Sequence, residues 1–159
     1  MEIPQEQSNI PVTFSLIQCQ ILDFKFSDYA KKNKDIIAYN KFEFEFQLTM
    51  DIKELEKNIS FTLKIKLFEK KTDIAKYEIC ELISLNLFNI VNFEEAIKKN
   101  DGQFQIPNTF IAFANTVSVN NTRGMLVAKL ENSAYNNAVI PLIDMGIFNQ
   151  IPPQSAPTK

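Results

Sequence analysis

Apolar and polar side chains alternate along two stretches in the first half of the chain. From Phe42 to Met50 every even position is apolar, and from Ile59 to Leu67 every odd position is apolar. A period of two places the apolar side chains of a strand on one face and the polar ones on the other. The two stretches, joined by residues 51–58, therefore predict strands of an antiparallel sheet with one apolar face.

Two further stretches predict strands with a less regular pattern. Within residues 12–26 the apolar positions change phase between Leu16 and Ile17, which is typical of a β-bulge or a strongly twisted strand. Toward the end of residues 74–89 apolar side chains occupy both phases. That pattern indicates either burial on both faces or an exposed apolar patch. The lysine-rich residues 29–37 predict a loop.

The second half of the chain predicts helices. Asn92 is suited to cap a short helix over residues 93–99, which the following Asp-Gly pair ends. Pro107 opens a long helix over residues 108–131, at a position where its missing N–H is harmless. Residues 135–141 then predict an extended loop. This order predicts an α+β domain, a four-stranded antiparallel sheet followed by one long helix.

The ends of the chain predict the domain boundaries. Residues 1–11 are expected to be a flexible N-terminal segment and residues 12–148 the folded domain. Residues 149–159, with three prolines, are expected to be a disordered tail.

The predicted helix over residues 108–131 is longer than is needed to cover one face of a small sheet. Its apolar and small stripe includes Gly124 and Ala128, which permit close helix approach although glycine costs about 1 kcal/mol relative to alanine there. Arg123 is suited to hold a carboxylate bidentately and so fix the register of two subunits. Glu131, Asp144 and the strand glutamates remain open as its partner. We therefore predict a subunit interface at Asn121, Arg123, Gly124 and Ala128.

Composition narrows the possible chemistry. The 159 residues suit one domain, and a net charge of −2 lacks the cationic surplus that nucleic-acid binding needs. The chain has no histidine, which excludes Ser-His-Asp and Cys-His catalysis and every imidazole zinc site. With three glycines it has no phosphate-binding loop. We expect a non-enzyme without a cofactor or a metal site.

The composition and the first residues of the chain also indicate the cellular compartment. The first residues have no basic cluster followed by an apolar run, and no stretch approaches the length of a membrane span. Cys19 and Cys80 are too few for a disulfide framework and lie among apolar residues. We expect two reduced, structural cysteines in a cytoplasmic protein that does not insert into a membrane.

Four short motifs resemble the SecB export chaperones in their order and spacing, over about residues 12–148. They are Ile79-Cys80-Glu81-Leu82 with Leu87-Phe88 after it, Pro107-Asn108, Thr122-Arg123-Gly124, and a segment from Pro141 to Phe148. Three features depart from the family. Leu85-Asn86 replaces a Gly-Gly pair, the loop before Pro141 is longer, and the last helix is nearly missing.

The resemblance implies a cytosolic tetramer, a dimer of dimers, that holds secretory precursors unfolded without ATP and passes them to the SecA motor. Divergent members of the family instead guard the antitoxin of a toxin–antitoxin pair. The residues alone also allow a third alternative, a homo-oligomeric interaction module that binds one folded partner and has no chaperone activity.

The resemblance also implies two sets of site residues. The SecA-type contact corresponds to Asp23, Ile79 and Glu81, while Ser27 stands at a second acidic position. Fourteen phenylalanines supply apolar surface for unfolded chains, although most large apolar side chains fill a core; residues 82–88 are the best candidates for exposure. The substrate groove corresponds to Leu85, Leu87, Phe88, Phe110, Phe113, Tyr135, Ile140 and Leu142.

Overall fold

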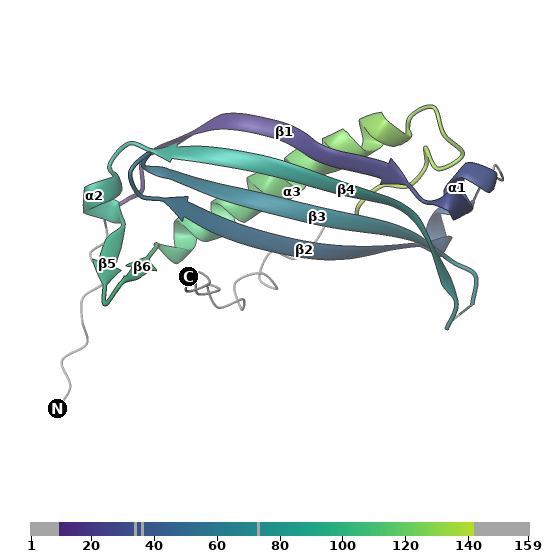
Figure 1. Ribbon diagram of the computed structural model, residues 1–159, viewed down its shortest axis with the longest axis horizontal. Coiled ribbons are helices and arrows are strands. Elements are labelled where there is room, and N and C mark those ends of the chain that lie inside the picture. Colours follow the sequence, from purple (N-terminus) through teal and green to yellow (C-terminus); the bar gives the residue numbers. More distant parts are fainter. Residues whose placement is uncertain (1–9, 34, 36, 73, 142–159) are drawn as a thin grey trace.

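The computed structural model describes residues 10–33, 35, 37–72 and 74–141. In chain order the elements are β1 (Phe14–Phe26), α1 (Asp28–Lys32), a 3₁₀ turn (Tyr39–Lys41), β2 (Phe42–Lys53), β3 (Asn58–Lys70), β4 (Lys76–Ile90), α2 (Phe93–Ala96), β5 (Lys98–Asn100), β6 (Gln103–Gln105) and α3 (Asn108–Leu130). The long strands form one sheet, and α3 crosses one face of it (Figure 1). The predicted α+β fold is confirmed.

The four long strands are antiparallel in the order β1-β4-β3-β2, so β1 and β2 are the two edges. β2 and β3 form a hairpin in unbroken register from Phe42 opposite Glu69 to Lys53 opposite Asn58. The apolar residues of the two alternating stretches, 42–50 and 59–67, belong to the core on the α3 side. The alternation in the sequence is therefore confirmed on both strands.

β1 pairs with β4 less regularly. The register shifts between Leu16 and Gln18 and again between Ile21 and Asp23. Ile17 and Leu22 are thus extra residues at two bulges, and the phase change in the sequence is explained by the first of them.

β4 lies between β1 and β3, and its apolar side chains point to both faces of the sheet. Cys80, Leu82 and Phe88 are buried on the side of α3, and Ile83 lies half-buried on the opposite face. Over residues 82–88 buried side chains on the α3 side therefore alternate with the half-buried Ile83, Leu85 and Leu87 on the opposite face.

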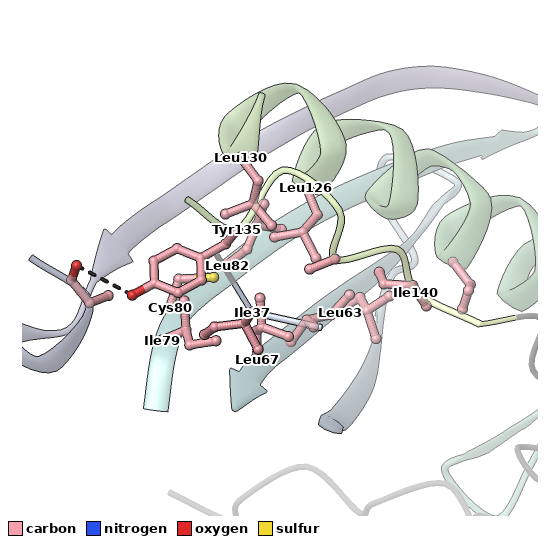
Figure 2. Packing of buried hydrophobic residues seen from close by; sticks show 14 residues of the cluster. Ile37, Leu63, Leu67, Ile79, Cys80, Leu82, Leu126, Leu130, Tyr135 and Ile140 are labelled. Carbon is pink, nitrogen blue, oxygen red and sulfur yellow. Dashed lines mark hydrogen bonds between the residues drawn. The ribbon is translucent and has the colours of Figure 1, made fainter. Parts of the chain in front are cut away.

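The core has two apolar clusters. One gathers around Phe61, Phe88 and Phe110, toward the beginning of α3. The other gathers around Leu82, Leu130 and Tyr135, toward its end. Figure 2 shows the second cluster, in which the Tyr135 hydroxyl donates a hydrogen bond to the backbone oxygen of Ala30. Tyr135 thereby ties the segment after α3 to α1.

A row of polar side chains separates the two clusters. We call it the polar seam, and it consists of Ser84 and Asn86 of β4 with Asn115, Ser118, Asn121 and Thr122 of α3. The Ser84 and Thr122 hydroxyl oxygens are 2.7 Å apart, and Asn121 Nδ2 donates to Asn86 Oδ1 at 2.8 Å. Three buried atoms of the seam have no partner within the described part of the chain: Asn86 Nδ2, Asn115 Oδ1 and Ser118 Oγ.

Two local predictions were wrong. Residues 29–37 begin within a helix, because Ser27 caps α1 by accepting a hydrogen bond from the Ala30 N–H at 3.1 Å. The helix expected over 93–99 ends at Ala96. Lys98–Asn100 instead pairs with β6, since Asp101 and Gly102 adopt positive φ angles of 50° and 79° and turn the chain back.

Only some of the predictions for the end of the chain fall on described residues. α3 ends at Leu130, one residue before the predicted end. Residues 135–137 form a turn before the extended stretch 138–141 begins. The segment 142–148 and the predicted tail 149–159 lie outside the described residues.

Candidate functional site

The predicted groove residues do not form one groove in this chain. Four of them are buried in the core (Phe88, Phe110, Tyr135 and Ile140), two are half-buried on the opposite sheet face (Leu85 and Leu87), and Phe113 is exposed. Leu142 lies outside the described residues. The buried four were misplaced because α3 and the segment after it cover the sheet where their side chains point.

The residues predicted for the SecA-type contact are also dispersed. Ile79 is fully buried, because a register shift between Leu67 and Phe68 makes it an extra residue that joins the core. It does not lie on the outer face of the sheet. Asp23 is exposed on that face, since it pairs with Ile83.

Glu81, the third of these residues, is enclosed by lysines. Its carboxylate lies 2.7 Å from Lys64 Nζ, 3.0 Å from Lys25 Nζ and 3.7 Å from Lys66 Nζ, and its side chain is 5% exposed. Hydrogen bonds from Lys64 and then Lys25 lower its pKa to about 2. Because these lysines come from β1 and β3, Glu81 ties three strands together and does not offer a free carboxylate to a partner.

The predicted oligomer interface lies on α3, and all four of its residues are at least partly accessible. Gly124 and Ala128 are exposed and Arg123 is half-buried. Asn121 is half-buried too, and its Nδ2 donates a hydrogen bond to Asn86 Oδ1 of the sheet. Between Asn108 and Ala128 the helix carries one charged residue, Arg123, whereas the solvent face of a surface helix is ordinarily rich in charge.

The surroundings of Gly124 and Arg123 leave this face of α3 open. A Cβ built on Gly124 meets no atom within 4 Å, so packing within the chain does not require glycine there. A shallow hollow of about 490 Å³ lies beside it, lined by Gly124, Val127, Ala128, Glu131 and Asn136. Within the described residues, no carboxylate forms an ion pair with Arg123.

A second surface, which the sequence interpretation missed, follows the edge strand β1. Residues 14–22 contain no charged side chain, and Leu16, Ile17 and Leu22 are 41%, 54% and 51% exposed. The two most exposed of them, Ile17 and Leu22, are the extra residues at the bulges. The signal in the sequence was the phase change together with nine consecutive uncharged residues.

The exposed apolar surface of β1 continues onto α3. The Phe14 ring centroid lies 5.0 Å from that of Phe110 in the core and 5.1 Å from that of Phe113, which is 51% exposed. We call Phe14, Leu16, Ile17, Leu22 and Phe113 the β1 surface. It is an apolar surface built on a strand edge and the first half of α3.

The opposite edge of the sheet is charged. β2 exposes Glu45, Asp51 and Lys53, and Lys76 Nζ lies 2.7 Å from Glu43 Oε1 and 2.5 Å from Glu45 Oε1. Charged side chains on an edge strand oppose pairing with another chain. The sheet therefore has one edge with charge and one long stretch of edge without it.

The two cysteines have different environments. Cys80 is buried, and desolvation raises the pKa of its thiol to about 12. Cys19 is exposed in the middle of β1, opposite Asn86. The prediction that both are structural therefore fits the position of Cys80 and not that of Cys19.

No family model matches the chain, and no curated protein matches it. The SecB resemblance thus stays a prediction that rests on the sequence motifs. Over the described ranges, no helix is long and apolar enough to span a bilayer, and no group of acidic and thiol side chains could hold a metal ion.

Proposed function

We propose that the chain is a holdase, an ATP-independent chaperone of the cytoplasm that binds unfolded polypeptides at the β1 surface. The observation that carries this proposal is the exposure of Leu16, Ile17 and Leu22 on an edge strand that has no charge over residues 14–22. Unfolded chains expose apolar side chains and unpaired backbone, and both find partners on such an edge.

The test of this function is suppression of aggregation. A stoichiometric amount of the protein should keep an unrelated, chemically unfolded enzyme from aggregating after dilution, without ATP. A module that binds one folded partner does not protect an unrelated client. Unchanged aggregation at a stoichiometric ratio would contradict the proposal.

Cys19 gives a second readout without any substitution. Because Cys19 is exposed and Cys80 is buried, a maleimide reagent should label Cys19 first. Bound client should slow that labelling several-fold, since Cys19 lies in the middle of the β1 strand. An unchanged rate with client bound would place the client elsewhere.

We propose further that copies assemble, as a dimer of dimers, through the exposed face of α3. The single charge on residues 108–128, the open space at Gly124 and an Arg123 without an ion-pair partner in the described part of the chain support this assembly. Size-exclusion chromatography with light scattering should give an oligomer that Gly124→Leu disrupts and Thr49→Leu, on the β2 edge, leaves intact. A monomer that does not change on concentration would contradict it.

Delivery of precursors to SecA is the more specific part of this role. Of the three residues predicted for that contact, Asp23 is the exposed one. A pull-down of SecA by the wild-type protein that Asp23→Lys abolishes would support an export role. Aggregation suppression without SecA binding would favour a holdase for other clients, such as an antitoxin.

A further inference from the structure

We propose that the polar seam selects one register of α3 on the sheet and excludes the registers one helical turn away. The seam lies between the two apolar clusters that join α3 to the sheet. This role is separate from the holdase function and does not depend on it. It gives the exposed side of α3, with Gly124 and Ala128, a fixed position relative to the sheet.

The buried side of α3 repeats every four residues. Six of its eight buried positions form this series: Phe110, Ala114, Ser118, Thr122, Leu126 and Leu130. Side chains four residues apart form a ridge along a helix, and such ridges pack against neighbouring elements. A shift of α3 by four residues, about 6 Å along its axis, therefore places the same ridge on the sheet again. The spacing alone does not decide between these registers.

The middle of the ridge differs from its ends. Each end belongs to one of the two apolar clusters, whereas Ser118 and Thr122 in the middle are polar and fully buried. The Thr122 hydroxyl oxygen lies 2.7 Å from that of Ser84. Beside it, Asn121 Nδ2 donates to Asn86 Oδ1 at 2.8 Å. Because Ser84 and Asn86 are both 0% exposed, water does not replace a partner that either of them loses.

A shift of one turn in either direction breaks this pairing. Met125 comes opposite Asn86 in one shifted register, and Val117 does so in the other. The amide of Asn86 loses its partner in both. The second shift also brings Thr122 to the place of Leu126, inside an apolar cluster. A buried polar group without a partner costs free energy, so both shifted registers are disfavoured.

Stability does not explain why the seam is polar. Asn86 Nδ2, Asn115 Oδ1 and Ser118 Oγ are buried without a partner within the described residues, and apolar side chains of similar size would avoid that cost. In coiled coils, a buried polar residue that lowers stability specifies the register of the helices. The seam has the same combination of an energetic cost and a polar contact that fits one register.

The decisive experiment replaces the seam with apolar side chains and measures where α3 lies. The seam variant combines five substitutions: Ser84→Ala, Asn86→Leu, Ser118→Ala, Asn121→Leu and Thr122→Val. One spin label is attached at Asn120, exposed on α3, and the other at Lys41 or at Asp51, near the two ends of β2. Cys19→Ser removes the exposed native thiol. Labelled protein is diluted with unlabelled protein, so that each distance is measured within one chain.

A shift of α3 changes the two distances in opposite senses. The beginning of α3 packs in the same cluster as Met50, and its end packs in the same cluster as Phe42. We expect one distance for each label pair when the seam is intact. The seam variant should show a second distance for each pair, displaced by up to about 6 Å and populated to about one-tenth or more. A seam variant with the original distances alone would overturn the proposal.

A matched control exchanges the two hydroxyl side chains and keeps their hydrogen bond. Ser84→Thr with Thr122→Ser should retain a single register, because both hydroxyls remain. A second distance in this control would contradict the proposal, since the shift would then not depend on the pairing. If the seam variant does not unfold cooperatively in urea, Asn86→Leu with Asn121→Leu takes its place. That pair removes the contact that opposes both shifts, and the same two distances decide the outcome.

Discussion

The two edges of the sheet are strands of nearly equal length with opposite properties. β2 alternates strictly, faces solvent with glutamate, aspartate and lysine, and is joined to Lys76 by ion pairs. β1 has no charge over residues 14–22, and its bulges expose Ile17 and Leu22. A protein that only needed to avoid edge-to-edge association would carry charge on both edges. The difference supports the proposal that the β1 edge (Figure 1) is a binding surface.

The supports beneath the two edges differ as well. The apolar residues of β2 pack against both core clusters along its whole length. β1 packs against the clusters at fewer positions, through Phe14, Ile21, Phe24 and Phe26, and Cys19 in its middle lies opposite Asn86 of the polar seam. The following substitutions change one of these features at a time, in order of decreasing effect.

Phe110 anchors the first residues of β1 through its contact with Phe14. It also packs against Phe61 and Phe88 in the core. Phe110→Ala should lower the free energy of unfolding by about 3–4 kcal/mol, the usual cost of a large cavity. Urea unfolding measures the loss. Phe113→Ala, a change to an exposed ring three residues later, should cost less than about 1 kcal/mol. Similar losses of stability for the two variants would contradict the assignment of Phe110 to the core and of Phe113 to the surface.

Glu81 fastens the far end of β1 through Lys25. Glu81→Gln should destabilise the protein by about 1–2 kcal/mol, a value at the low end for charged hydrogen bonds because the lysines are partly exposed. The loss should be accompanied by weaker protection of β1 at its C-terminal end in hydrogen exchange. A variant as stable as the wild type at pH 7 would contradict this role.

The same residue gives a pH dependence with a definite sign. The pKa of Glu81 is about 2 in the folded protein, against a usual value of 4.5. As the pH falls below about 4.5, the unfolded state binds the proton first, so stability decreases until about pH 2. Glu81→Gln should flatten the urea midpoint over this window. An equally steep profile in the variant would assign the loss to other carboxylates.

Ser118 tests the polar seam beside the middle of β1. Its hydroxyl oxygen is buried without a partner within the described residues. Ser118→Ala should therefore raise the free energy of unfolding by about 0.5–1 kcal/mol. Thr122→Val is the matched control and should destabilise, because Thr122 bonds both Ser84 and the Ser118 carbonyl oxygen. A loss of stability in Ser118→Ala would indicate a partner such as a buried water.

Removing charge from β2 should have the smallest effect on stability of these substitutions. It also tests the difference between the two sheet edges most directly. Glu43→Gln with Glu45→Gln should alter the free energy of unfolding by no more than about 0.5 kcal/mol, because these ion pairs are exposed. The variant should nevertheless self-associate more readily in light scattering, since a second edge loses its protection. Unchanged association would mean that charge does not guard this edge.

The regular part of the fold could be predicted because its signals are local. Alternation over β2 and β3, and Pro107 before α3, specify those elements without knowledge of their partners. α1 was missed because it has five residues and its local signal is a single cap, Ser27. α2 was extended too far because the helical pattern does not reveal that Lys98–Asn100 finds a strand partner after a turn of positive φ.

The candidate site was harder to predict, since exposure depends on what lies opposite each residue. Tyr135 and Phe88 have the composition of a groove, yet α3 and the segment after it bury them. Glu81 has the appearance of a surface acid until three lysines from neighbouring strands are placed around it. Ile17 and Leu22 are exposed at bulges that pairing with β4 creates, and the proposed surface includes them for that reason.

Hydrogen–deuterium exchange of the protein with and without saturating unfolded client tests the central claim most directly. Amides of an edge strand that point away from the sheet exchange quickly until another strand covers them. The account predicts that client slows exchange over Gln18–Ile21 of β1 and leaves Phe42–Lys53 of β2 unchanged. Protection that appears on β2, or on α3 alone with β1 still exchanging freely, would contradict it.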